Sequence, residues 1–234
     1  MKKSSCFLHC GLRAAVLLTA LLSGAVASAS DNESFSRVTI GAGIGTTGYG
    51  PVLTVSATKN LTLSAGYSIL DFDADYDSDD ANFTGTLDFK NIDVLLHWHP
   101  FSGNFHLSAG AMFTDSAVTL IGVPKPNNTF TIGGNEYTTE QVGTLTGVGT
   151  VMDGTVPYVG LGWAKAPGKS GFGAFFNLGV LFIDAPSVSL SANGTLSGEA
   201  SFKESLRREE VDINDDLKDF ELYPVVRFGI TYSF

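Results

Sequence analysis

Histidine, aspartate and serine are the residue types in this sequence that could carry out covalent chemistry together. Asp93, His97 and His99 alternate along one stretch of chain, and His106 follows shortly after. If these stretches are strands, alternation places the four side chains on one face of the sheet. An Asp, His and Ser set suffices for acyl transfer, but no serine lies in a sharp elbow motif. We predict that neighbouring hydroxyls satisfy the histidines, with no catalytic residue and no metal site.

Arg227 is a full positive charge that alternation turns toward the same inner face. Burying it without a partner is expensive, so an acid must lie nearby. In the alternating pattern, Asp93 and Glu221 stand at inward positions, whereas Asp115 stands at an outward one. The predicted interior charge cluster consists of Arg227, Asp93, Glu221, His97 and His106. Such a cluster either fills the interior structurally or selects charged solutes.

An acidic segment offers six carboxylates within ten residues: Asp71, Asp73, Asp75, Asp77, Asp79 and Asp80. The segment lacks the glycine at loop position six and the acid at position twelve of an EF-hand. We predict a solvated acidic rim on the extracellular side. The alternative is a site where Ca²⁺ or Mg²⁺ bridges these acids to lipopolysaccharide phosphates.

Two glycine motifs resemble nucleotide-binding loops. Gly43–Gly48 satisfies G-x-G-x-x-G, yet Pro51 and another strand follow it, whereas a dinucleotide site needs a helix that starts there. Gly168–Ser170 matches the end of a phosphate loop, but Trp163 occupies the place of the first required glycine. We predict no cofactor.

Eight stretches of the chain alternate apolar with small or polar residues, the pattern of a half-buried strand. They are Val38–Ile44, Leu53–Ala57, Leu61–Ile69, Ile92–Trp98, Phe105–Phe113, Val159–Trp163, Phe172–Phe182 and Val226–Phe234. Short turns are expected near residues 58–60, 100–104 and 167–171, and longer polar loops near residues 71–84, 122–150 and 192–216. Short turns at one rim and long loops at the other are typical of bacterial outer-membrane barrels. The sequence predicts an all-β fold, a transmembrane eight-stranded antiparallel up-and-down β-barrel.

A soluble sandwich would also alternate apolar and polar residues. Three features favour the membrane. The polar positions are mostly Gly, Ser and Thr, which suits a narrow lumen. Aromatic residues such as Trp98, Trp163 and Phe172 gather at strand ends, where girdles meet the membrane interfaces. The nine residues Leu61–Ile69, tilted by roughly 40°, give a height of about 23 Å, close to the apolar band of such barrels.

The N-terminal region has the features of a secretory signal peptide. Lys2, Lys3 and Arg13 flank a short apolar run, and Ala27–Ala29 form a cleavage signature. We predict a signal peptide over residues 1–29 and a barrel over residues 30–234; the alternative is an N-terminal membrane anchor. Both cysteines lie in the first ten residues, so the mature chain contains none, and its 11 basic and 24 acidic residues give a net charge of −13. This acidity argues against nucleic acid as a partner.

The chain ends on an alternating strand that closes with an aromatic residue. Phe228, Ile230, Tyr232 and Phe234 look like the C-terminal signal that the bacterial outer-membrane assembly machinery reads. Three stretches, Gly45–Gly50, Pro157–Trp163 and Pro224–Tyr232, resemble the corresponding segments of CarO-type outer-membrane proteins, and Leu178–Val180 with Pro186–Leu190 extend the likeness. The acidic Asp71–Asp80 stretch does not match clearly.

The resemblance implies a monomeric eight-stranded barrel with a narrow lumen, linked with passage of small basic amino acids and of carbapenems. It also implies an inward basic residue where Arg227 stands. We expect a bacterial outer-membrane protein, in contact with lipid and lipopolysaccharide, that gives at most slow passage to small cationic or zwitterionic solutes. A non-conducting structural or surface-interaction protein is the alternative, and an outer-membrane lipid-modifying enzyme is a minor one.

Overall fold

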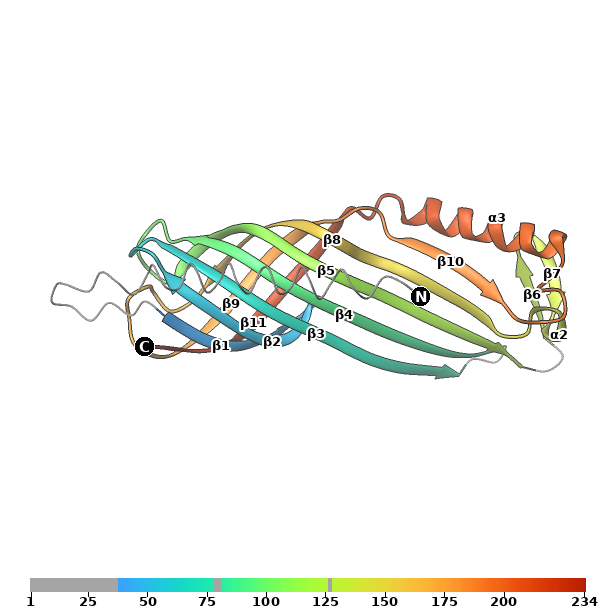
Figure 1. Cartoon of the computed structure of the whole chain (residues 1–234), viewed down its shortest axis with the longest axis horizontal. Helices are drawn as coiled ribbons and strands as arrows, with labels where there is room; N and C mark the ends of the chain where they lie inside the picture. The colour runs from blue at the N-terminus through green and yellow to red at the C-terminus, as the bar shows by residue number, and fades with distance from the viewer. Residues whose placement is uncertain (1–37, 78–80, 126–127) are drawn as a thin grey trace. The chain divides into compact units, whose positions relative to one another are not determined.

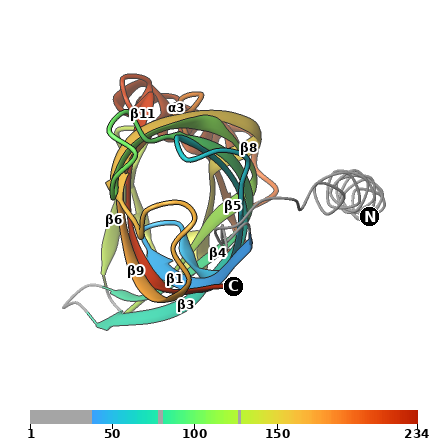
Figure 2. The same ribbon diagram turned by 90° about the vertical axis from the view of Figure 1, so that its left-hand side faces the viewer.

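The computed structural model describes residues 38–77, 81–125 and 128–234. The predicted signal peptide, both cysteines, Asp79 and Asp80 lie outside these residues. In the described chain, eight antiparallel strands pair in a closed ring (Figures 1 and 2). The ring strands are β1 (Val38–Gly45), β2 (Gly48–Ser56), β3 (Leu61–Asp77), β4 (Ala81–Trp98), β5 (Phe105–Pro124), β8 (Leu145–Trp163), β9 (Gly171–Phe182) and β11 (Leu222–Ser233). The predicted fold class is confirmed.

Two seams close the ring. β11 pairs with β1 and β9, so the last strand joins the first. β9 pairs with β8 from Tyr158 to Trp163, which completes the circle. The remaining described elements are β6 (Thr129–Ile132), β7 (Asn135–Thr138), α2 (Thr139–Val142), β10 (Ser187–Ala192) and α3 (Ala200–Leu217). No described helix is both long and apolar enough to cross a membrane.

The strands fall into two length classes, which the sequence analysis did not anticipate. β1, β2, β9 and β11 have 8 to 12 residues, whereas β3, β4, β5 and β8 have 17 to 20. The long strands are neighbours in the ring, so one side of the wall continues past the end of the other (Figure 1). We call this part, with β10 paired to residues 145–150 of β8, the extension; in β3 it starts at Asp71.

The loop predictions at the long-loop rim are therefore wrong in large part. Asp71–Asp77 continues β3, and its partner β4 starts at Ala81, because strand alternation does not stop at the aspartates. The predicted loop at residues 122–150 contains β6, β7, α2 and the start of β8. The predicted loop at residues 192–216 contains α3, whose acidic and basic residues at spacings of three and four suit a helix.

Within the ring, apolar side chains face outward and small polar side chains face inward. On β3, Thr62, Ser64 and Ser68 are buried, whereas Tyr67 is exposed. Leu63 is half-buried. Phe176 and Phe228, which are paired with each other on β9 and β11, are exposed on the outer face. The ring thus has an apolar outside and a largely polar inside.

In the extension this arrangement is reversed. Three rows of register partners continue the inner face across β3, β4, β5, β8 and β10, and all fifteen positions are apolar, aromatic or glycine. The rows are Phe72–Leu87–Val118–Gly149–Val188, Ala74–Gly85–Leu120–Gly147–Leu190 and Tyr76–Phe83–Gly122–Leu145–Ala192. The outer face carries mainly Asp, Thr and Ser instead.

The free edge of β10 is covered by α3. The side chain of Asn214 accepts a hydrogen bond from the Val188 amide at 2.7 Å and donates one to the Val188 carbonyl at 3.0 Å. Glu210, one helical turn earlier, accepts from the Leu190 amide. Four helix residues rise about 6 Å and two strand residues about 6.6 Å, so the helix matches the spacing of a strand partner. An uncovered edge would invite pairing with another chain.

Candidate functional site

The interior of the ring brings together Arg227 from β11 and Asp93 from β4. Arg227 Nη1 donates to Asp93 Oδ1 at 2.8 Å, and both side chains are more than nine-tenths buried. Arg227 Nε and Nη2 and Asp93 Oδ2 have no hydrogen-bond partner among the described residues. The pair is therefore a buried ion pair in which three polar atoms lack a hydrogen-bond partner among the described residues.

Glycines on the neighbouring strands β3 and β1 make room for this pair. A Cβ on Gly66 would collide with the Asp93 carboxylate, and one on Gly43 would lie 3.2 Å from Arg227 Nε. An eight-stranded barrel has an interior just wide enough for side chains to fill. Larger residues at these inward positions would therefore displace the ion pair.

Glu221, predicted to join the cluster, does not. It precedes β11, which begins at Leu222, and its side chain is exposed. Its backbone carbonyl accepts from the Ile183 amide instead. Alternation would turn Glu221 toward the interior if the strand reached it. Because β11 begins only at the next residue, Glu221 lies outside the ring.

The three histidines lie toward the end of the ring where the short turns are, in the same interior as the ion pair. His97 has Ser64 Oγ at 2.7 Å from Nε2 and Ser108 Oγ at 2.7 Å from Nδ1. His106 Nε2 lies 3.0 Å from Asn177 Oδ1, and its ring packs edge-on against His97 with centroids 4.8 Å apart. Both nitrogens of His97 are thus engaged by hydroxyls.

His99 follows the end of β4 and faces the same space. Its Nδ1 lies 2.9 Å from the Gly103 carbonyl, and its ring centroid is 5.2 Å from that of His106. No described group of three or more His, Cys, Asp or Glu residues is arranged to hold a metal ion. Serine hydroxyls occupy both ring nitrogens of His97, so neither nitrogen contacts a described carboxylate that would orient it as the base of a Ser-His-Asp triad.

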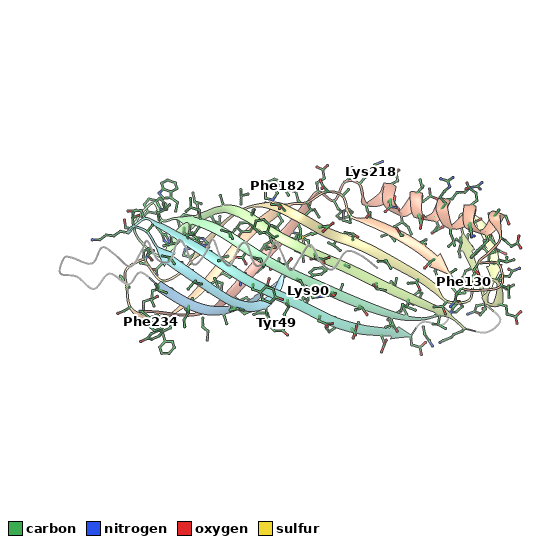
Figure 3. All side chains as sticks on the ribbon, in the orientation of Figure 1. Tyr49, Lys90, Phe130, Phe182, Lys218 and Phe234 are labelled. Atoms are coloured by element: carbon green, nitrogen blue, oxygen red, sulfur yellow. The ribbon has the colours of Figure 1, made fainter. Side chains whose placement is uncertain are left out.

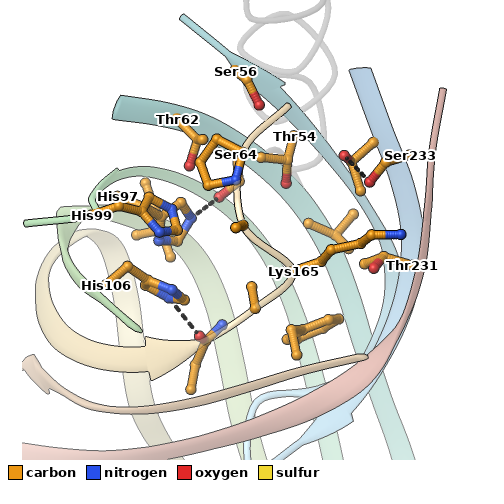
Figure 4. Close-up of a pocket in the computed structure, with 18 of the residues that line it drawn as sticks. Thr54, Ser56, Thr62, Ser64, His97, His99, His106, Lys165, Thr231 and Ser233 are labelled. Carbon is orange, nitrogen blue, oxygen red and sulfur yellow. Dashed lines mark hydrogen bonds between the residues drawn. The ribbon is translucent and has the colours of Figure 1, made fainter. Parts of the chain in front are cut away.

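A cavity of about 70 Å³ lies among these side chains and is lined by Arg227, Asp93, the three histidines and several Ser and Thr hydroxyls. It has room for a few water-sized groups. Figure 4 shows the hydroxyls and imidazoles pointing into it from several strands. The cavity therefore has a polar, hydrogen-bonding lining with one charged pair.

The turn between β8 and β9 borders this cavity on the short-turn side. Its residues Lys165, Ala166 and Pro167 line the cavity, and Ala166 is buried. Lys165 Nζ donates to the carbonyl of Phe172 at 3.0 Å and to that of Ser170. In Figure 4 Lys165 crosses the space toward Thr231. The hydrogen bonds of Lys165 thus tie this turn to the start of β9.

On the other side of the ion pair, an apolar cluster shares the interior of the ring with the buried polar side chains of Ser68, Asn91 and Thr114. It contains Phe89, Leu95, Met112, Met152, Val156, Tyr158, Leu181, Ile183 and Val225. The Tyr158 ring lies where a Cβ on Gly160 or Gly179 would be, so two glycines accommodate it.

The acidic residues of β3 lie on the outer face of the extension and are exposed. Asp73 and Asp75 accept hydrogen bonds from the hydroxyls of Thr86 and Thr84, and Asp77 forms an ion pair with Lys125 at 2.6 Å. At the other end of the ring, Phe228, Ile230, Tyr232 and Phe234 are all exposed on the outer face.

Sequence reasoning missed Lys165, Asn177 and Tyr158 as site residues. Asn177 and Tyr158 have the inward parity of their strands, which could have indicated them. Lys165 lies in a turn, where strand parity gives no direction.

The closed ring with an apolar outside, a polar filled inside and all-antiparallel neighbours defines an eight-stranded up-and-down barrel of the outer-membrane type. Two solved structures share this fold. CarO from Acinetobacter baumannii is 22% identical with a TM-score of 0.60, and CarO2 from the same organism is 23% identical with a TM-score of 0.59. Each alignment covers 87% of this chain and 100% of the other. No family model and no curated protein matches the sequence. The fold expected from the CarO resemblance is confirmed.

Proposed function

We propose that this chain is a small CarO-like barrel protein of the bacterial outer membrane, whose lumen gives at most slow passage to small cationic or zwitterionic solutes. The observation that carries the proposal is the half-satisfied Arg227–Asp93 pair, whose two residues line the polar cavity. A zwitterion supplies both an acceptor for the free guanidinium nitrogens and a donor for Asp93 Oδ2.

The outer surface of the ring supports the membrane location. Exposed aromatic residues gather near the short-turn end, where Phe172 packs against Tyr232 and Tyr232 against Phe234. Tyr49, Lys90 and Phe182 lie at a common level farther along, where the short strands end (Figure 3). Trp98 lies eight positions after Lys90 on β4, a height of about 20 Å for a tilted strand. The apolar surface between them matches a bilayer core.

The filled interior supports slow rather than free passage. The apolar cluster occupies part of the ring beside the ion pair, and a charged group that contacts it would lose hydration. The acidity of the mature chain would raise the local concentration of cations at its mouth. In this proposal the protein acts as a monomer surrounded by lipid and lipopolysaccharide, after insertion by the barrel-assembly machinery.

Conductance in planar bilayers tests the proposal. We expect small resolved currents that favour lysine over glutamate, and loss of this preference in the double variant Arg227→Met with Asp93→Leu, which removes both charges together. Lys125→Met, in an exposed pair of the extension, is the matched control and should leave the preference unchanged. If the double variant does not alter the currents, solutes do not pass through the cavity that contains the ion pair.

A non-conducting anchor is the second candidate, and the apolar cluster favours it, because its large buried side chains occupy part of the lumen. In that case the extension would carry the function and the ring would only hold it at the membrane. Complete absence of current from correctly folded protein would support this candidate and overturn passage.

A further inference from the structure

The wall of the ring has a gap where β8 passes from one neighbour to the next. β8 pairs with β9 over Tyr158–Trp163 and with β10 over Leu145–Thr150. Between these segments, residues 151–157 pair only with β5 among the described strands. On the other edge, residues 183–186 connect β9 to β10 and form no backbone hydrogen bond with β8 in the described chain. We call this place the wall gap; its peptide groups lack the strand partner that closes a barrel elsewhere.

A cavity of about 500 Å³ lies in the wall gap. This volume is within the roughly 300–1,000 Å³ that is typical of small-molecule sites. Residues of β8 between Thr150 and Pro157 line one side, and residues between Phe182 and Ser187 line the other. Phe182 lies at the level where the short strands end (Figure 3). The cavity therefore spans the gap from edge to edge, at the place where the ring gives way to the extension.

The floor of this cavity is apolar. Met152, Val156 and Ile183 line it, and each is more than nine-tenths buried. The same three side chains belong to the apolar cluster inside the ring. The floor thus offers the hydrocarbon part of a ligand a surface that is continuous with the packed interior.

The rim of the cavity is polar and acidic. Asp153 lies on β8 and Asp184 on the opposite edge, both are exposed, and Thr155 and Ser187 add hydroxyls. Among the described residues, no Lys, Arg or His lines the cavity. Neither carboxylate has a hydrogen-bond or ion-pair partner in the described chain. Two unpaired carboxylates from opposite edges of one cavity favour a cation over an anion.

We propose that the cavity in the wall gap binds a primary ammonium that carries a short hydrocarbon chain. The carboxylates of Asp153 and Asp184 and the rim hydroxyls accept hydrogen bonds from the three N–H donors of the ammonium. The hydrocarbon chain lies on the apolar floor. This cavity shares no lining residue with the cavity beside Arg227, so binding here does not depend on conduction through the ring.

The methionines of the chain make this site observable. Only Met112 and Met152 follow the predicted signal peptide. Met152 lines the cavity, whereas Met112 belongs to the same apolar cluster but does not line it. Methyl NMR of ¹³C-methionine protein in phosphatidylcholine nanodiscs therefore gives a reporter and an internal control, and Met152→Leu assigns the two signals. The probes are hexylammonium, hexyltrimethylammonium, hexanoate and methylammonium.

We expect hexylammonium to shift the Met152 signal saturably and to leave the Met112 signal nearly unchanged. Hexanoate should bind at least about tenfold more weakly because it carries the wrong charge, and hexyltrimethylammonium because it has no N–H to donate. Methylammonium should also bind at least about tenfold more weakly, since it leaves the apolar floor uncovered.

Two changes to the rim test the assigned contacts. Asp153→Asn with Asp184→Asn should weaken hexylammonium binding about tenfold and remove the preference over hexanoate. Asp115→Asn is the matched control, because Asp115 is the exposed register partner of Asp153 on β5 and does not line the cavity. Thr155→Trp, at an exposed position on the rim, should abolish binding by filling the cavity.

Three results would overturn the proposal. Equal shifts of both methionines that do not saturate would mean that the amine partitions into the lipid. Hexylammonium binding that the double Asp→Asn variant leaves unchanged would remove the carboxylates from recognition. Unchanged binding to Thr155→Trp would place the ligand elsewhere. Nanodiscs that contain phosphatidylethanolamine distinguish the source of the ammonium: if they shift Met152 and block hexylammonium, the proposal holds with a lipid headgroup as the ligand.

Discussion

The ring and the extension are built from the same strands but expose opposite faces. On β3 the outward positions are apolar up to Ile69 and become aspartates from Asp71, while the inward positions change from Thr and Ser to Phe72 and Tyr76. The register between β3 and β4 is unbroken from Leu61 to Asp77, so no bulge turns the strand over. The sequence itself changes phase. An alternating pattern with a period of two therefore indicates a strand. Which of the two alternating positions is apolar indicates which face of the strand meets water.

The two regions also manage their edges differently. The ring pairs every edge with a neighbour, so it needs no protection. The extension ends in two edges: α3 covers β10 through Asn214 and Glu210, and aspartates line β3. The ring therefore protects its strand edges by closing on itself. The extension protects one edge with a helix and the other with charged residues.

Ion pairs in the two regions should differ most in their contribution to stability. Arg227→Met leaves the Asp93 charge buried without a partner and should lower the free energy of unfolding by about 3–5 kcal/mol. Lys125→Met breaks an exposed pair in the extension and should cost less than about 1 kcal/mol. Urea unfolding in liposomes measures both.

The double variant Arg227→Met with Asp93→Leu sharpens this result. It removes both charges, so much of the loss should be recovered. If the double variant is as unstable as Arg227→Met alone, the cost comes from packing around residue 227 rather than from the stranded carboxylate.

Outward valines of similar exposure should respond to charge according to region. Val94 lies midway along the ring part of β4, and Val148 lies on the outer face of the extension. Val94→Arg should destabilise the protein by about 2–4 kcal/mol, because the charge enters hydrocarbon. Val148→Arg should change stability by about 0.5 kcal/mol or less, because the charge enters water. Equal effects at the two sites would contradict a membrane around the ring.

The contact between α3 and β10 should be local to the extension. Asn214→Ala removes two hydrogen bonds to the Val188 backbone and should destabilise the helix contact by about 1–2 kcal/mol. Hydrogen exchange of the Val188 amide should accelerate about tenfold, while ring amides stay protected. Asp212→Ala, at an exposed position of the same helix, serves as the control. Faster exchange throughout the ring would show that the two regions unfold together.

All eight ring strands could be predicted from alternation, because hydrocarbon outside and small residues inside give a strong period of two. The extension was missed because the aspartates suggested a loop by composition, although Phe72 and Tyr76 keep the same period in the opposite phase. The helix α3 was missed for a different reason. Its acidic and basic residues at spacings of three and four indicate a helix, but they carry little apolar signal.

The site was predictable where strand parity applies. Parity placed Arg227 and Asp93 on the inner face, and the structure joins them. Parity failed for Glu221, because the end of a strand cannot be located from alternation alone. It gave no information on Lys165, since the direction of a turn depends on hydrogen bonds formed only after the strands have paired.

Protonation of Glu204 on α3 should have the smallest and most local effect of these changes, and it tests whether the extension responds separately from the ring. The hydrogen bonds that Arg207 donates lower the pKa of Glu204 from 4.5 to about 2, and Arg208 adds to this effect. An acid with a lowered pKa contributes stability above its ordinary pKa and loses that contribution as the pH falls through the lowered value. The helix should therefore keep this contact down to about pH 2 and lose it below. A carboxyl NMR titration of Glu204 measures the midpoint directly, and Arg207→Gln should move it back toward 4.5 while the ring strands show no change. A midpoint that Arg207→Gln leaves unmoved would contradict the contact in the extension without affecting the ring.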